Sequence, residues 1–139
     1  MAAVVRVRLE RNPSRAIETS AVLNGGFATE RPTVLLPRRA ALALFPDYPA
    51  GSRPLPALTA GGQTTLRELG EPLWVRVLAG DREGPAASCR VLVSEAEDEV
   101  LLSDYAIDAL GVRIEQHGPG IWRFADEQRT RASVPAEPW

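Results

Sequence analysis

Few residues of this chain could take part in chemistry, and Asn24 is the most conspicuous of them. It follows an apolar stretch from Ile17 to Leu23 and precedes Gly25 and Gly26, so a strand is expected to end here in a sharp turn. A carboxamide can hold a water molecule, but it cannot take a proton from that water at neutral pH. Asn-Gly is also a common turn dipeptide, which explains the same residues without any chemistry.

A second candidate site surrounds Asp104. The apolar run Val100–Leu102 leads into Ser103, a favourable N-cap for a helix from Asp104 to Leu110, and Gly111 suits the position after that helix. The Asp104 carboxylate could act as a base or hold a cation. A carboxylate in the first helical turn also gains roughly 0.3–1 kcal/mol from the helix dipole. We favour this structural interpretation, with an ion pair from Asp104 to Arg31 or another arginine.

The sequence predicts no metal site and no cofactor. Its one histidine, His117, lies in a His-Gly-Pro-Gly segment typical of an exposed turn, and its one cysteine, Cys89, lies in an apolar strand pattern. A zinc cluster within one subunit would therefore have to use carboxylates. The glycine-rich segment Ala60-Gly61-Gly62 suits the tip of a hairpin, which could move over a groove.

Composition excludes several classes of function. The 139 residues suit one domain with a single core, and the net charge of −2 gives no positive field to attract nucleic acid or an anionic membrane. No apolar run approaches the roughly 20 residues that span a bilayer, and the first residues lack the pattern of a signal peptide. We expect a soluble cytoplasmic protein with no nucleic-acid or membrane partner.

Periodicity predicts an all-β fold with two short helices. Residues 1–125 are expected to form a single domain and residues 126–139 a flexible C-terminal tail. Trp74, Trp122 and Phe124 occur at strand spacing and are expected in the core or at an interface. The expected strands are 3–9, 17–23, 33–36, 73–78, 88–93, 100–102, 112–115 and 121–124, with a hairpin over 58–65, helices at 38–45 and 104–110, and a loop over 46–56.

This order of elements resembles the single-domain aspartic proteases of the retropepsin type, over roughly residues 17 to 124. In that family an apolar strand delivers the motif Asp-Thr/Ser-Gly, and a short strand and a helix follow. Here Ser20–Phe27 and then Thr33–Pro37 occupy those places. Ala60-Gly61-Gly62 is similar to the tip of the family's flap hairpin. A second motif, an apolar-apolar-Gly turn before a helix, is similar to Leu101, Leu102, Ser103 and Asp104.

The resemblance implies a retropepsin-like acid-protease β-barrel closed by dimerisation. Each subunit of such a homodimer gives one aspartate to a site on the two-fold axis, and terminal strands, here 3–9 and 121–125, complete the interface. Three positions depart from the pattern: Asn24 replaces the aspartate, Gly25 replaces the threonine or serine whose hydroxyl bonds across the dimer, and Ser103 replaces the glycine. Catalysis in this family needs two carboxylates that share a proton, and two amides cannot supply them.

We therefore expect a non-catalytic homodimeric module that binds a peptide or protein partner in a residual cleft. The alternative is a divergent aspartic-type peptidase that uses Asp104, another carboxylate, or the aspartate formed if Asn24 deamidates. A more distant hypothesis, a β-barrel associated with nucleic acid, is disfavoured by the net charge and by the absence of aromatic–basic motifs.

Overall fold

Strands dominate the structure, a computed structural model that describes residues 2–59 and 62–139. The two helices of the described residues are α1 (Arg38–Leu44) and α2 (Asp104–Ala109). Their ten strands are β1 (Val4–Asn12), β2 (Arg15–Leu23), β3 (Thr33–Pro37), β4 (Ser52–Thr59), β5 (Gly62–Leu69), β6 (Leu73–Leu78), β7 (Ala87–Ser94), β8 (Val100–Leu102), β9 (Val112–Gln116) and β10 (Ile121–Phe124). The all-β prediction with two short helices is confirmed.

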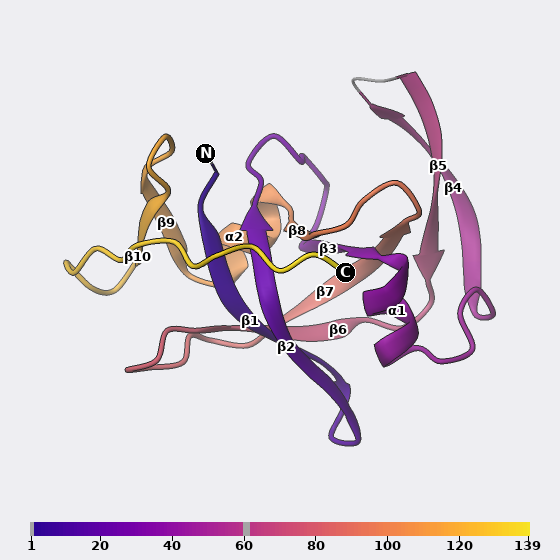
Figure 1. Cartoon of the computed structure of the whole chain (residues 1–139), viewed down its shortest axis with the longest axis horizontal. Helices are drawn as coiled ribbons and strands as arrows, with labels where there is room; N and C mark the ends of the chain where they lie inside the picture. The colour runs from indigo at the N-terminus through magenta and orange to yellow at the C-terminus, as the bar shows by residue number, and fades with distance from the viewer. Residues whose placement is uncertain (1, 60–61) are drawn as a thin grey trace.

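Six of these strands close into a barrel (Figure 1). The hydrogen-bonded order runs β3-β8-β2-β1-β6-β7, and a further pairing of β3 with β7 closes the ring. The β2–β8 and β3–β7 pairs are parallel, whereas the β3–β8 pair is antiparallel. Closure of the ring leaves these six strands with few unpaired edges. It also brings the ends of β2 and β8 side by side, and these are the strands that precede Asn24 and Ser103.

The barrel interior is filled by apolar residues at alternate positions along the strands. On β1, Val5, Val7 and Leu9 are fully buried, whereas Arg6 and Arg8 face outward, as the alternation predicted. Trp122 and Phe124 of β10 also belong to the core, and their rings meet edge to face. Trp74 does not belong to it: its side chain is 51% exposed. Its neighbours Leu73 and Val75 take the inward positions of β6, which leaves Trp74 on the outer face.

A long hairpin, β4–β5, leaves the barrel and extends on the same side as the connection from β2 to β3 (Figure 1). It is joined to the barrel through β5, which pairs with β7 at Arg67 and Glu68. The expected loop over 46–56 is wrong at its end, because β4 already begins at Ser52. The loop was expected because residues 46–56 contain four prolines and a glycine, and two of these prolines, Pro54 and Pro56, lie in β4. They are compatible with a strand here because β4 is an edge strand, where a missing N–H costs little.

The helices begin and end close to the predicted positions. Pro37 lies at the N-cap of α1, whose residues Ala40, Ala41 and Leu44 are buried. Helix α2 is capped by Ser103 and is followed by Gly111, whose φ of 70° lies in the left-handed region that favours glycine. No helix in the described part of the chain has the length and apolar character needed to cross a membrane.

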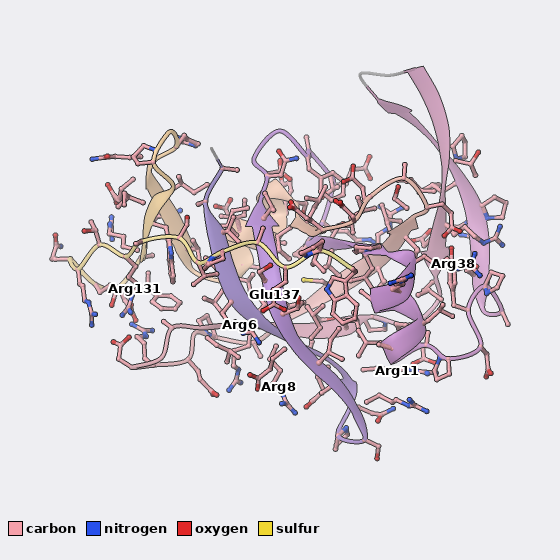
Figure 2. The ribbon with its side chains drawn as sticks, viewed as in Figure 1. Arg6, Arg8, Arg11, Arg38, Arg131 and Glu137 are labelled. Carbon is pink, nitrogen blue, oxygen red and sulfur yellow. The ribbon has the colours of Figure 1, made fainter. Side chains whose placement is uncertain are left out.

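The segment 126–139, expected to be a flexible tail, lies along the outside of β1 and β2. The backbone N–H of Val134 donates to the carbonyl of Val4, and that of Glu137 donates to the Ser20 hydroxyl. The Trp139 indole N–H donates to the Thr19 hydroxyl at 3.0 Å. Figure 2 shows Glu137 beside Arg6 of β1, with which it forms an ion pair.

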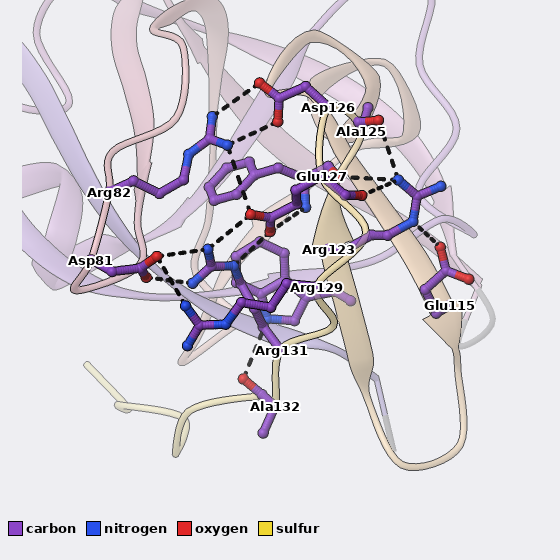
Figure 3. A network of polar contacts seen from close by, with 12 residues as sticks. Asp81, Arg82, Glu115, Arg123, Ala125, Asp126, Glu127, Arg129, Arg131 and Ala132 are labelled. Atoms are coloured by element: carbon purple, nitrogen blue, oxygen red, sulfur yellow. Dashed lines mark hydrogen bonds and ion pairs between the residues drawn. The ribbon is translucent and has the colours of Figure 1, made fainter.

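The start of this segment is held by Arg131, which lies in a network of ion pairs (Figure 3). Its guanidinium donates to Asp81 at 2.5 and 3.0 Å and to Glu127 at 2.7 and 3.0 Å. It also lies near the Phe124 ring, 5.4 Å from the centroid. Arg131 thereby connects the segment after β10 to the loop between β6 and β7.

Candidate functional site

The turn after β2 places Asn24 at one end of the barrel. The backbone N–H of Asn24 donates to the carbonyl of Leu102 on β8 at 3.1 Å, and the N–H of Phe27 donates back to the Asn24 carbonyl at 2.9 Å. The side-chain oxygen of Asn24 accepts the N–H of Gly26 at 3.1 Å. This carboxamide is half-buried and stabilises its own turn. The turn interpretation of Asn-Gly therefore accounts for the local geometry.

Asp104 joins this turn to the start of α2. Its backbone N–H donates to the carbonyl of Phe27 at 3.1 Å, and its Oδ1 accepts the N–H groups of Thr29 and Tyr105 at 3.1 and 2.8 Å. The two motifs that the sequence singled out, 75 residues apart at the Thr29–Asp104 contact, are thus in direct contact. By accepting these two backbone N–H groups, Oδ1 of Asp104 stabilises the local fold.

The expected ion pair between Asp104 and Arg31 is wrong. Arg31 contacts Glu68 instead, with 3.4 Å between Nη2 and Oε2. Among residues 2–59 and 62–139, Asp104 forms no ion pair with any other arginine either. The physical reason is that Oδ1 of Asp104 already accepts two backbone N–H groups, while the buried carboxylate of Glu68 attracts the guanidinium of Arg31.

Ser103, which stands where the resemblance implies glycine, is fully buried, and its hydroxyl oxygen accepts two hydrogen bonds. Its Oγ accepts the N–H of Ala106, the N-cap interaction, at 3.2 Å and the N–H of Thr33 at 3.1 Å. Leu102 before it is buried, and Leu101 is half-buried. Ser103 therefore fixes the α2 turn to the first residue of β3, which no sequence pattern indicated.

A hollow of about 490 Å³ lies beside the Asn24 turn. His117 lies in an exposed turn, as the sequence indicated, and it also lines this hollow. Asp104 does not line it, so the polar side chains at hand are one carboxamide and one imidazole. The lining residues are Ala2, Ala3, Leu23, Asn24, Gly25, Gly26, His117 and Gly118. A single chain thus places no pair of carboxylates here to share a proton.

The remaining sequence candidates are outside this hollow. Ala60 and Gly61 of the expected flap tip lie outside the described residues, and Gly62 pairs with Thr59 at the end of the hairpin. Cys89 is buried in the core, and burial raises the pKa of its thiol to about 12, so it is no nucleophile at neutral pH. Within the described ranges no three His, Cys, Asp or Glu residues are placed to hold a metal ion.

The sequence did not indicate a second pocket, which lies between the β2–β3 connection and the hairpin. Its volume is about 620 Å³, and its lining includes Arg31, Arg53, Glu68 and Arg90. Hydrogen bonds from Arg90, and then from Arg53, hold the pKa of Glu68 below its usual range despite its burial. In the sequence these four residues lie on four separate segments. Only the pairing of β4, β5 and β7 brings them together.

No protein-family model and no curated protein sequence matches this chain.

Proposed function

We propose that this chain is a non-catalytic retropepsin-like module that forms a homodimer around its Asn24 turn and binds an extended peptide. The proposal depends mainly on one observation. The turn after β2 and the turn before α2 are hydrogen-bonded to each other at the end of a closed barrel, and a long hairpin extends on the same side. This arrangement supports the proposal, in which a carboxamide takes the place of the catalytic carboxylate.

The absence of catalysis follows from the chemistry of Asn24. An aspartic protease activates water with one carboxylate while a second carries the proton. Two amides facing each other across a two-fold axis cannot accept that proton. Asp104, the alternative base, lies behind the turn with Oδ1 occupied by the N–H groups of Thr29 and Tyr105. Hydrolysis by Asp104 is accordingly the less supported alternative.

Dimerisation is supported by the surface beside the turn. Gly25 and Gly26 are exposed in the turn. Tyr105, the second residue of α2, is 51% exposed and is one of two large hydrophobic residues exposed among the described residues. A second copy on a two-fold axis through this end of the barrel would cover them. Removal of the remaining apolar area of Tyr105 from water would contribute roughly 25 cal/mol per Å².

Peptide binding is supported by the hairpin. A hairpin joined to the barrel along one strand can lie over an extended peptide, which is recognised through its main-chain N–H and C=O groups. This capacity does not depend on a catalytic aspartate. A homodimer would offer two hairpins over one groove.

Two measurements test this proposal. Sedimentation equilibrium should give twice the mass of the 139-residue chain, and panning of a random peptide library against the full chain should enrich extended sequences above background. A monomer at every concentration would contradict the dimer. A dimer that enriches no peptide would leave assembly as the function and contradict the binding role.

A further inference from the structure

The pocket beside Glu68 contains more positive than negative charge. Three arginines surround the carboxylate of Glu68: Arg53 donates from Nε at 3.1 Å and Nη2 at 2.6 Å, Arg90 donates from Nε at 2.6 Å, and Arg31 reaches it at 3.4 Å. The second carboxylate of the lining, Glu71, is paired with Arg11, which lies outside the pocket, through two hydrogen bonds of 2.9 Å. Guanidinium groups stay charged at all ordinary pH values, and the pKa of Glu68 is lowered, so the carboxylate is charged as well. The cluster therefore has two positive charges beyond those that Glu68 neutralises.

The surplus charge faces solvent. The side chain of Glu68 is only 9% exposed, whereas those of Arg31 and Arg53 are 64% and 73% exposed. In the described part of the chain, the Nη1 groups of Arg31 and Arg53 and both Nη groups of Arg90 make no hydrogen bond. These N–H groups are donors at the wall of a pocket of about 620 Å³.

The donors are also held in place before any ligand arrives. Arg53 is paired with Glu68 across the β4–β5 ladder, and Arg90 lies beside Thr33 in the β3–β7 ladder. The carbonyl of Arg31 accepts the hydroxyls of Thr29 and Thr33 at 2.7 and 2.8 Å, which fixes the chain at that point. Binding to donors that are already positioned loses less conformational entropy than binding to free side chains.

The geometry points to a subsite for an acidic side chain, aspartate or glutamate, of the bound peptide. This inference rests on the proposed peptide-binding function. The pocket connects the segment that carries Asn24, through Arg31, with the hairpin that would cover the peptide, through Arg53. A carboxylate there would accept paired N–H groups from the planar guanidinium forks. Glu68 keeps the arginines apart and oriented, and a peptide carboxylate would complete the neutralisation.

The test uses an array of N-acetylated, C-amidated octapeptides in which each position is varied in turn. The full-length protein is compared with an Arg31→Gln, Arg53→Gln double variant. Both arginines are exposed, and Glu68 keeps its 2.6 Å contact with Arg90, so the variant should fold. The matched control is an Arg15→Gln, Arg39→Gln double variant, which removes the same charge from exposed arginines outside the pocket.

We expect one peptide position at which Asp or Glu is preferred over Asn or Gln by about tenfold, equivalent to about 1.4 kcal/mol. The preference should disappear in the Arg31, Arg53 variant and persist in the Arg15, Arg39 control. Binding of array peptides without a preference for Asp or Glu at any position would overturn the subsite alone. A preference lost equally in both double variants would do the same.

Binding of no array peptide, either by the wild type or by the variants, would overturn the subsite together with the proposed function. Inorganic phosphate, titrated in parallel, distinguishes the source of the anion. Phosphate binding that depends on Arg31 and Arg53, without peptide enrichment, would assign these arginines to a free anion and contradict the peptide subsite.

Discussion

The buried hydroxyl of Ser103 accepts the backbone N–H of Thr33, with 3.1 Å between oxygen and nitrogen. This hydrogen bond joins the N-cap of α2 to the first residue of β3. Since the N–H of Asn24 donates to Leu102, the residue before Ser103, the same short segment also holds the Asn24 turn. Ser103 therefore has a structural role that a glycine could not fill.

Ser103→Ala should lower the free energy of unfolding by about 1–3 kcal/mol, because the buried N–H groups of Thr33 and Ala106 lose their acceptor. Denaturation by urea measures the loss. Ser88→Ala is the matched control, since Ser88 is exposed and should change stability by less than about 0.5 kcal/mol. Equal stability of the two variants would contradict the role of Ser103.

Asp104 should act through its oxygen as an acceptor more than through its charge. Asp104→Ala removes the acceptor for Thr29 and Tyr105 and should cost about 0.5–1.5 kcal/mol. Asp104→Asn keeps an oxygen at the same place and should cost less, losing mainly the dipole interaction of roughly 0.3–1 kcal/mol. Thermal and urea denaturation of both variants provide the comparison. An Asn variant as unstable as the Ala variant would indicate that Asp104 stabilises the fold through its negative charge and not through its oxygen as an acceptor.

The ion pairs of Arg131 should make the free energy of unfolding depend on pH in the acidic range. Hydrogen bonds from Arg131 lower the pKa of Asp81 from 3.8 and that of Glu127 from 4.5, in each case to about 2. The unfolded chain therefore binds protons more readily than the folded chain below about pH 4.5. Stability from these groups is present above that pH and is lost as the pH falls towards about 2.

Arg131→Gln should reduce this acid dependence, which urea denaturation between pH 7 and about 2 would show. The variant should be less stable than the wild type at neutral pH, and the two curves should converge in acid. Arg39→Gln, an exposed arginine of α1, should keep the wild-type dependence. Parallel curves for Arg131→Gln and the wild type would show that the network contributes nothing to the acid response.

Most of the strands could be predicted because the alternation of apolar and polar residues is a local property of the sequence. The bounds of β8 at Val100–Leu102 and of β10 at Ile121–Phe124 agree with the predicted ones. The start of β4 was missed because four prolines and a glycine within residues 46–56 are typical of a loop, and the tolerance of Pro54 and Pro56 depends on β4 being an edge strand. Trp74 was expected in the core or at an interface, and its exposure on the outer face of β6 excludes the core and leaves the interface as a prediction.

The candidate site could be predicted only in part, for a related reason. The Asn24 and Ser103 segments each have a local signal in the turn and cap residues, but their contact with each other depends on the β2–β8 pairing. The cluster around Glu68 has no such signal, because the register of strand pairing determines which charges meet. The Arg31 contact with Glu68 shows the same limit: sequence reasoning assigned that arginine to Asp104.

Catalysis should be absent from the natural chain and recoverable by substitution. Gly25 has open space where a Cβ would be placed, so Gly25→Thr should be accommodated. We expect no peptide cleavage by the wild type from acidic to neutral pH, and detectable cleavage after Asn24→Asp with Gly25→Thr. A peptide-library digestion followed by mass spectrometry measures both. Cleavage by the wild type that disappears in Asp104→Asn would instead support the divergent peptidase.

The central claim, that two copies meet at their Asn24 turns, can be tested by disulfide cross-linking of a Gly25→Cys variant. The natural Cys89 does not interfere, because it is buried with a thiol pKa of about 12. Ser14→Cys is the matched control. Ser14 is exposed in the turn between β1 and β2, at the opposite end of these strands from Asn24 (Figure 1).

Across a two-fold axis at Asn24, the Cα atoms of the two introduced cysteines should come within the roughly 4.4–6.8 Å that a disulfide requires. Under mild oxidation, a non-reducing gel should show Gly25→Cys as a covalent dimer and Ser14→Cys as a monomer. A Gly25→Cys protein that stays monomeric, or that cross-links no faster than Ser14→Cys, would contradict the account.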